Sequence, residues 1–403
     1  MKKFISLLLL ITIMTSFLSG CSSDGDVQSG PVKITIWHDK EEAVANVLTE
    51  AFATLLPDIQ VVLEKKDGLT DALKLVGNDA KSAPDMYFFA HDKIGVYAEM
   101  GILEPITTFV SKDVIAGYVE STIEAATYKD EIYQLPIYYE TLLFMYNKSL
   151  MGDKDVPKTT EALFEYMKNN TKDGYFGFVE QHSTAYYSVP WIHGFSGSLI
   201  DELGNPMLNA PETIEALTYH HKFLSYMPGE SEYSTVNTLF LEGYAHSTIN
   251  GPWLVPSVIE AGIDLGFAKM PIVDETGLPL GPYTGVQGVH VLKVSAEKKK
   301  EAITKVLNLL VDPQVSINMA HVSGAAPALK KSYEDESIQK NEMIMAMKET
   351  AETGVAMPNR PEMDVMFIVT GNLLVSINMK GNDIVAAVEE FQSKAEKLIE
   401  AMK

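Results

Sequence analysis

The chain is poor in arginine and cysteine for its length. Its 403 residues include one arginine, Arg360, and one cysteine, Cys21. A single cysteine excludes a disulfide within the chain, and it excludes zinc sites and iron–sulfur clusters built from several cysteines. Arginine is the side chain that binds phosphate through two parallel hydrogen bonds. Its scarcity and the net charge of −22 argue against a nucleic-acid partner.

Catalytic signatures are also lacking. The sequence contains no GxxxxGK[ST], GxGxxG or HExxH motif, and the stretch that comes nearest to a nucleophile elbow, Gly194-Phe-Ser-Gly-Ser, lacks its spacing. Because His220 and His221 are adjacent in an expected helix, they point to different sides, and we predict surface histidines rather than a metal site. A glycosidase pair of carboxylates stays open, since such pairs come from distant segments. We expect no catalytic residue, metal or cofactor.

The N-terminus has the layout of a bacterial export signal. Two lysines precede an apolar run over residues 4–17, and Leu-Ser-Gly then leads into Cys21. The run falls short of the roughly 20 residues of a spanning helix. Small residues directly before a cysteine are typical of a lipobox, in which the thiol receives a diacylglyceryl group. We therefore predict a lipoprotein signal peptide over 1–20 and a lipidated tether over 21–31. The alternative is a plain signal peptide or an anchor helix.

The order of expected elements indicates an α/β protein. A single hydrophobic core rarely exceeds about 250–300 residues, so 403 residues predict two or three domain-sized units. The apolar spacing predicts strand 33–38, helix 41–56, strand 59–63, helix 71–76 and strand 85–89. Strands that alternate with helices in this way form parallel sheets.

Aromatic rings stand beside charged groups at the ends of two of these strands. Asp39 and Lys40 follow the first strand, and Phe89, Asp92 and Lys93 follow the third. Ligands of α/β folds bind beyond the carboxyl ends of strands, and sugars combine apolar faces for stacking with hydroxyls for hydrogen bonds. The alternative is structural: the aspartates cap helices, the first lysine is solvated and the phenylalanine belongs to the core.

Two further residues stand out on the same grounds. Glu140 is a charge inside the long apolar stretch 135–148, and a buried carboxylate needs a partner. Ligand hydroxyls or an internal lysine would supply one. Trp253 follows an Asn-Gly-Pro turn at an expected helix start, where its ring either faces a cleft or joins the core.

Taken in order, these segments resemble the bacterial extracellular solute-binding proteins of family 1, most closely the maltose/maltodextrin-binding proteins. The likeness spans about 33–403 and is carried by KITIW, PDMYFFAHDKIGVYAEMGILEPI, LPIYYETLLFMYNK, TINGPW and AMPNRPEM. It implies a two-lobed periplasmic-binding-protein-like fold (type II), with a ligand cleft between lobes joined by a hinge. It implies an N-terminal lobe of 32–138 and 288–336 and a C-terminal lobe of 143–283 and 343–403.

The resemblance also implies which residues hold the ligand. They are Asp39, Lys40, Phe89, Asp92, Lys93, Glu140, Tyr186, Trp253 and Phe367.

Several positions depart from the family pattern. Phe89 stands where the maltose binders carry a stacking Trp, and Lys93 stands where they carry Arg. Thr184 replaces an expected acid, Phe367-Ile replaces a Trp-Tyr pair, and Gly371 replaces an Arg. Smaller rings and fewer hydroxyl partners alter specificity. The departures leave the particular sugar open and favour an oligosaccharide, foremost an α-glucan.

The sequence thus predicts the lipid-anchored substrate-binding component of a carbohydrate ABC importer. Such a protein captures a malto-oligosaccharide or related oligosaccharide and delivers it to an ABC permease. We expect a monomer at the outer face of the cell membrane. The alternatives are a binding protein for a non-sugar solute such as a polyamine, a sensor co-receptor without a transport role, and a secreted glycosidase. A cationic solute would need a cleft dominated by acids, without Lys40 and Lys93.

Overall fold

Two separate sheets carry the fold of the computed structural model, which describes residues 31–402. The predicted signal peptide and the lipidation site at Cys21 lie outside the described residues. The larger sheet has the order β12-β7-β11-β3-β1-β2, with β4 and β13 also paired to β11, and the smaller has the order β10-β8-β9. Between residues 31 and 402, no helix is long and apolar enough to cross a bilayer.

The strands of the larger sheet are β1 (Val32–His38), β2 (Ile59–Lys65), β3 (Met86–Ala90), β4 (Leu103–Glu104), β7 (Leu135–Thr141), β11 (Tyr283–Leu292), β12 (Ala326–Pro327) and β13 (Val355–Ala356). Those of the smaller sheet are β8 (Leu143–Asn147), β9 (Ser247–Asn250) and β10 (Leu265–Ala268), and β5 (Thr127–Tyr128) pairs separately with β6 (Glu131–Ile132). The helices are α1 (Glu42–Leu55), α2 (Leu69–Val76), α3 (Ile94–Glu99), α4 (Lys112–Ala116), α5 (Glu120–Ala126), α6 (Thr160–Asn170), α7 (Ala185–Gly194), α8 (Pro211–His221), α9 (Tyr233–Leu241), α10 (Val255–Glu260), α11 (Lys293–Ala296), α12 (Lys300–Leu310), α13 (Pro313–Ser323), α14 (Glu336–Gln339), α15 (Glu342–Ala351), α16 (Met363–Leu374) and α17 (Ile384–Glu400). Shorter helical turns are η1 (His91–Lys93), η2 (Ile106–Thr108), η3 (Lys222–Tyr226), η4 (Pro252–Leu254), η5 (Lys330–Glu334) and the π-helical η6 (Val375–Met379).

The N-terminal third confirms the predicted α/β alternation. β1 pairs in parallel with β2 on one side and with β3 on the other. α1 buries Val44, Leu48 and Phe52, which repeat every four residues and therefore lie on one face of the helix. The carboxyl ends of β1 and β3 lie side by side as a result, and the residues that follow them meet at one edge of the sheet.

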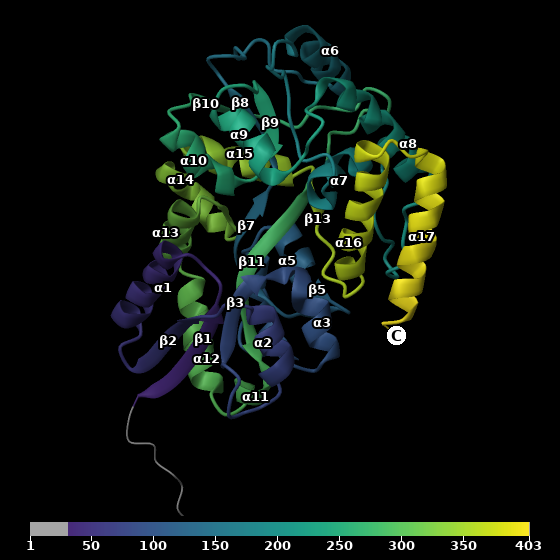
Figure 1. Cartoon of the computed structure of the whole chain (residues 1–403). Coiled ribbons are helices and arrows are strands. Elements are labelled where there is room, and N and C mark those ends of the chain that lie inside the picture. Colours follow the sequence, from purple (N-terminus) through teal and green to yellow (C-terminus); the bar gives the residue numbers. More distant parts are fainter. Residues whose placement is uncertain (1–30, 403) are drawn as a thin grey trace, which may run out of the picture.

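The chain crosses between the two sheets at their common boundary. β7 ends in the larger sheet at Thr141, and β8 begins in the smaller sheet at Leu143. The return passage leads from β10 to β11, and Thr141 Oγ1 donates to the carbonyl of Tyr283 at 3.0 Å. β13 pairs with the first residues of β11, so a third passage lies beside the other two. In Figure 1, β7 and β11 run through the middle of the molecule, between the part that holds β1–β3 and the part that holds β8–β10.

His220 corrects one expectation, because it is buried at 1% exposure instead of lying at the surface. Its Nε2 contacts Oε1 of the fully buried Glu180, which also accepts a hydrogen bond of 3.0 Å from Trp191 Nε1. A buried carboxylate requires such donors, which explains the inward histidine. The expected divergence of the pair is correct, since His221 Nδ1 lies 3.3 Å from Asn378 Oδ1 instead.

We predict that His290→Phe makes the fold less sensitive to acid. The His290 ring is fully buried, stacks on Tyr87 at 4.2 Å between centroids, and has no hydrogen-bond partner for either nitrogen among the described residues. Burial lowers the pKa of His290 from 6.5 to about 3. Its contribution to folding is therefore complete above pH 6.5 and is lost as the pH falls toward that lowered pKa.

Phenylalanine keeps the flat ring and removes the titration. Denaturant unfolding measured between about pH 7 and about pH 4.5 should show a shallower loss of stability in the variant, by up to about 1 kcal/mol per pH unit. Equal pH slopes in the two proteins would show that His290 does not drive acid unfolding.

Candidate functional site

A chain of polar contacts joins the ends of β1 and β7 to the middle of β11. Lys40 Nζ lies 2.8 Å from Asp39 Oδ1 and 2.6 Å from Gln287 Oε1. The Gln287 amide then donates to Glu140 Oε1 at 3.2 Å. The Lys40 side chain is only 9% exposed, so the alternative of a solvated lysine is wrong. Asp39 caps no helix either, because Glu41 is the N-cap of α1 and no side chain caps it.

Glu140 is a carboxylate without an ion-pair partner in the described part of the chain. Burial raises the pKa of Glu140, while the hydrogen bond from Gln287 and the charge of Lys40 act in the opposite direction. The alternative of an internal lysine as its direct partner is wrong, because the donor is the neutral amide of Gln287, and Lys40 contacts the carboxylate only through that amide. An amide satisfies part of the acceptor capacity of a carboxylate and supplies no charge, so hydroxyl donors have room to bind.

Three of the predicted rings lie near this chain of contacts. Phe89 is half-buried, with its centroid 5.5 Å from Lys40 Nζ. The rings of Tyr186 on α7 and Trp253 on η4 lie 6.3 Å apart. Burial raises the pKa of Tyr186, and the negative charge of Glu140 raises it further, which places the two side chains within electrostatic reach.

Trp253 is 40% exposed, which excludes the alternative of a core tryptophan. Its indole folds back over the Asn-Gly-Pro turn that precedes it. A Cβ on Gly251 would lie 2.2 Å from the ring, so glycine is required at that position for the indole to adopt this place. The turn therefore holds a broad apolar face at the surface in a fixed orientation.

A second group of predicted residues lies at the end of β3. Lys93 Nζ lies 3.1 Å from Asp92 Oδ2 and 2.5 Å from Asp364 Oδ1 on α16. Asp92 does not cap α3, because Lys93 is the N-cap of that helix and no side chain forms a capping hydrogen bond there. Phe367 lies one helical turn after Asp364, half-buried, with its ring 6.3 Å from that of Tyr283 on β11. β11 thus contacts both groups of residues.

Sequence reasoning missed Gln287 and Asp364, which connect the predicted residues to one another. A signal existed for each. Gln287 is a polar residue inside the apolar strand 283–292, which is the kind of signal that identified Glu140. Asp364 precedes Phe367 by three residues, and this spacing puts both on one face of a helix.

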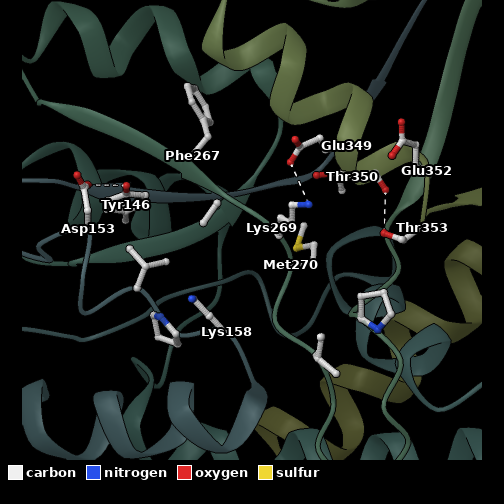
Figure 2. Close-up of a pocket in the computed structure, with 15 residues that line it drawn as sticks. Tyr146, Asp153, Lys158, Phe267, Lys269, Met270, Glu349, Thr350, Glu352 and Thr353 are labelled. Atoms are coloured by element: carbon white, nitrogen blue, oxygen red, sulfur yellow. Dashed lines mark hydrogen bonds and ion pairs between the residues drawn. The ribbon is translucent and has the colours of Figure 1, made fainter.

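One cavity borders this region, and a larger one lies on the smaller sheet. A cavity of 330 Å³ is lined by Asp39 and Phe89 together with residues 65–70. A larger one, of 750 Å³, lies between β8, β10 and the end of α15 and contains none of the predicted site residues. Figure 2 shows pairs among its polar groups: Lys269 lies 3.6 Å from Glu349, and the Tyr146 hydroxyl donates to Asp153 at 2.8 Å.

Known proteins resemble this chain over nearly all of its length. A maltotriose-binding protein of Pyrococcus abyssi is 31% identical over 384 residues, which are 92% of this chain and 83% of that protein. A galactooligosaccharide-binding protein of Bacillus subtilis is 26% identical over 422 residues, covering 100% of this chain and 98% of that protein. The crystal structure of a cyclo/maltodextrin-binding protein complexed with maltotetraose superposes with a TM-score of 0.85 at 26% identity, covering 94% of this chain and 100% of that one.

These likenesses confirm the predicted resemblance and the predicted two-lobed fold class. The family model described as "Bacterial extracellular solute-binding protein" matches residues 48–346, about three quarters of the chain. The chain therefore belongs to the bacterial extracellular solute-binding protein family.

Proposed function

We propose that this chain is the lipid-anchored, monomeric substrate-binding component of a carbohydrate ABC importer. It captures a malto-oligosaccharide or a related oligosaccharide and delivers it to a permease in the membrane. The observation that carries the proposal is the chain of contacts from Asp39 through Lys40 and Gln287 to Glu140, beside the exposed ring of Trp253. The names of relatives that bind maltotriose and galactooligosaccharide support it.

The ligand lies between two lobes that close around it. We assign residues 32–138 and 288–336 to the N-terminal lobe, and 143–283 and 343–403 to the C-terminal lobe. Such a protein needs no catalytic residue, because its function is a closed state that binds sugar more tightly than the open state. Residues of both lobes and of the passages between them then contact one ligand.

The charges in the cleft favour a neutral ligand. Lys40 and Lys93 each lie against the carboxylate of the preceding residue, so two of the acids there are already paired with a cation. A polyamine would require acids without these lysines. Glu140 accepts sugar hydroxyls, and the rings of Phe89, Tyr186, Trp253 and Phe367 stack on sugar faces.

We expect isothermal titration of the chain with maltotriose to show heat of binding, and Trp253→Ala to weaken binding by about tenfold or more, since ring stacking and lost burial both contribute. Tyr244→Ala is the matched control. Tyr244 is an aromatic side chain of similar exposure, 41% against 40%, and its ring pairs with Tyr175 away from the predicted site.

The control variant should bind like the wild type. A wild-type protein that gives neither heat nor a thermal shift with any of a panel of oligosaccharides would overturn the carbohydrate proposal. Equal losses of affinity in the two variants would show that Trp253 is not part of the binding site.

We expect Glu140→Gln to bind maltotriose more weakly and to unfold at a higher temperature without ligand. Because burial raises the pKa of Glu140 in the folded protein, this group stabilises the fold below its ordinary pKa, and that contribution is lost as the pH rises through the raised value. At neutral pH the charged form of Glu140 therefore lowers the stability of the fold, and the uncharged glutamine of the variant removes this cost.

The affinity should have the opposite pH dependence to the stability. Maltotriose binding by the wild type should weaken on acidification, starting at a higher pH than for an ordinary glutamate, because protonation removes an acceptor for hydroxyls. The Gln variant should show no such step. A variant that loses both stability and affinity at every pH would indicate a structural role for Glu140 instead.

We expect Cys21→Ala to abolish lipid attachment. In the native bacterium, palmitate supplied to the medium should label the wild type and leave this variant unlabelled, because the thiol is the acceptor of the diacylglyceryl group. Ser22→Ala, one residue further on, should be labelled like the wild type. Equal labelling of the wild type and Cys21→Ala would disprove the lipobox.

A further inference from the structure

Lys93 lies between two carboxylates that come from different parts of the chain. Asp92 is its neighbour on η1, directly after β3 of the larger sheet, at 3.1 Å. Asp364 belongs to the first turn of α16, and its Oδ1 is 2.5 Å away. Burial by itself lowers the pKa of Lys93, but the two carboxylates outweigh it and raise the pKa above the ordinary value. Among the described residues, Asp92 Oδ1 is buried without a hydrogen-bond partner.

α16 packs with the smaller sheet, so the contact between Lys93 and Asp364 joins the two halves of the molecule. Met363 and Met366 lie in the same core cluster as Phe144 of β8 and Ile249 of β9. Figure 1 shows α16 beside α17, away from β1–β3. The positive end of the α16 dipole also favours a carboxylate in its first turn, where Asp364 lies.

Asp364 lies shortly after β13, where the chain makes its third passage between the sheets. The Asn359 side chain donates to the carbonyls of Ala125 at 2.8 Å and Thr127 at 2.7 Å, and its own carbonyl accepts from Gly95 N at 2.9 Å. The chain is therefore fixed to the N-terminal side at residue 359, whereas α16, which begins four residues later, packs in the core cluster of the smaller sheet.

We propose that Asp364 is a positioning residue of the cleft, which holds Lys93 across the two lobes and stabilises the closed state before ligand binds. The inference rests on the proposed function for its effect on sugar affinity. Apparent affinity scales with the fraction of molecules in the binding-competent state, so an interlobe ion pair that raises this fraction tightens binding without touching the sugar.

The first test needs no ligand. The chain with Cys21→Ser carries no cysteine, so spin labels can be placed at Leu75→Cys on α2 and Ile259→Cys on α10, both exposed positions on opposite sides of the passages. Pulsed EPR of the ligand-free protein should show a short-distance population that decreases in Asp364→Asn. Identical distance distributions in the two proteins would overturn the proposal.

The second test uses the salt dependence of maltotriose binding. Because the sugar is neutral, salt acts only on charges of the protein. At about 10 mM NaCl, where the Debye length is roughly 30 Å, Asp364→Asn should raise the Kd by about threefold. At about 1 M NaCl, where it is roughly 3 Å, the two proteins should converge. Glu349→Gln, which breaks the remote pair with Lys269, is the matched control and should follow the wild type.

A double-mutant cycle separates positioning from direct contact. If Asp364 acts through Lys93, then Asp364→Asn should have no further effect on the Kd in a Lys93→Met background. Additive effects of the two substitutions would overturn the proposal. Failure of the wild type to bind any sugar would overturn the proposed function alone, since the ligand-free EPR comparison would still decide the role of Asp364.

Discussion

The arrangement of the site depends on one half-buried carboxylate, Glu140, that lacks an ion-pair partner among the described residues. Glu140 lies at the end of β7, directly before the chain passes to the smaller sheet, and its hydrogen-bond donor is the amide of Gln287. Partial removal of a carboxylate from water without a charged partner is unfavourable, and a single neutral hydrogen bond offsets only part of this cost. Its remaining acceptor positions are left to solvent and, in the proposed function, to the hydroxyls of a bound sugar. The charge of Glu140 thus lowers the stability of the fold, while in the proposed function it raises the affinity for the ligand.

The amide also explains why the other charges near β11 are ordered. Gln287 uses its nitrogen for Glu140 and its oxygen for Lys40, whose ammonium in turn contacts Asp39. A lysine in place of the glutamine would neutralise Glu140 and repel Lys40. The amide of Gln287 fixes the positions of Glu140 and Lys40 without adding a charge. The cleft therefore suits the uncharged solute of the proposed function, even though the chain as a whole carries −22.

Local patterns were enough to predict the parallel strands of the N-terminal third and the residues that follow them, because periodicity and capping act over a few residues. Contacts between distant segments were beyond their reach. Lys40 and Gln287 are 247 positions apart, and Lys93 and Asp364 are 271 apart. His220 was mispredicted for the same reason: its surroundings are set by Glu180, which is 40 positions away and fully buried. Only the resemblance to a known family indicated Tyr186 and Phe367.

A contact between lobes is useful to a binding protein only if it is weak. Asp364 is 44% exposed, and pairs of this kind contribute about 0.2–1 kcal/mol. That corresponds to a change of roughly 1.4- to 5-fold in the ratio of closed to open molecules. A stronger contact would shift the equilibrium further toward the closed state and would leave the cleft open too seldom for the ligand to enter. Partial exposure of Asp364 therefore suits a protein that must both close around its ligand and release it.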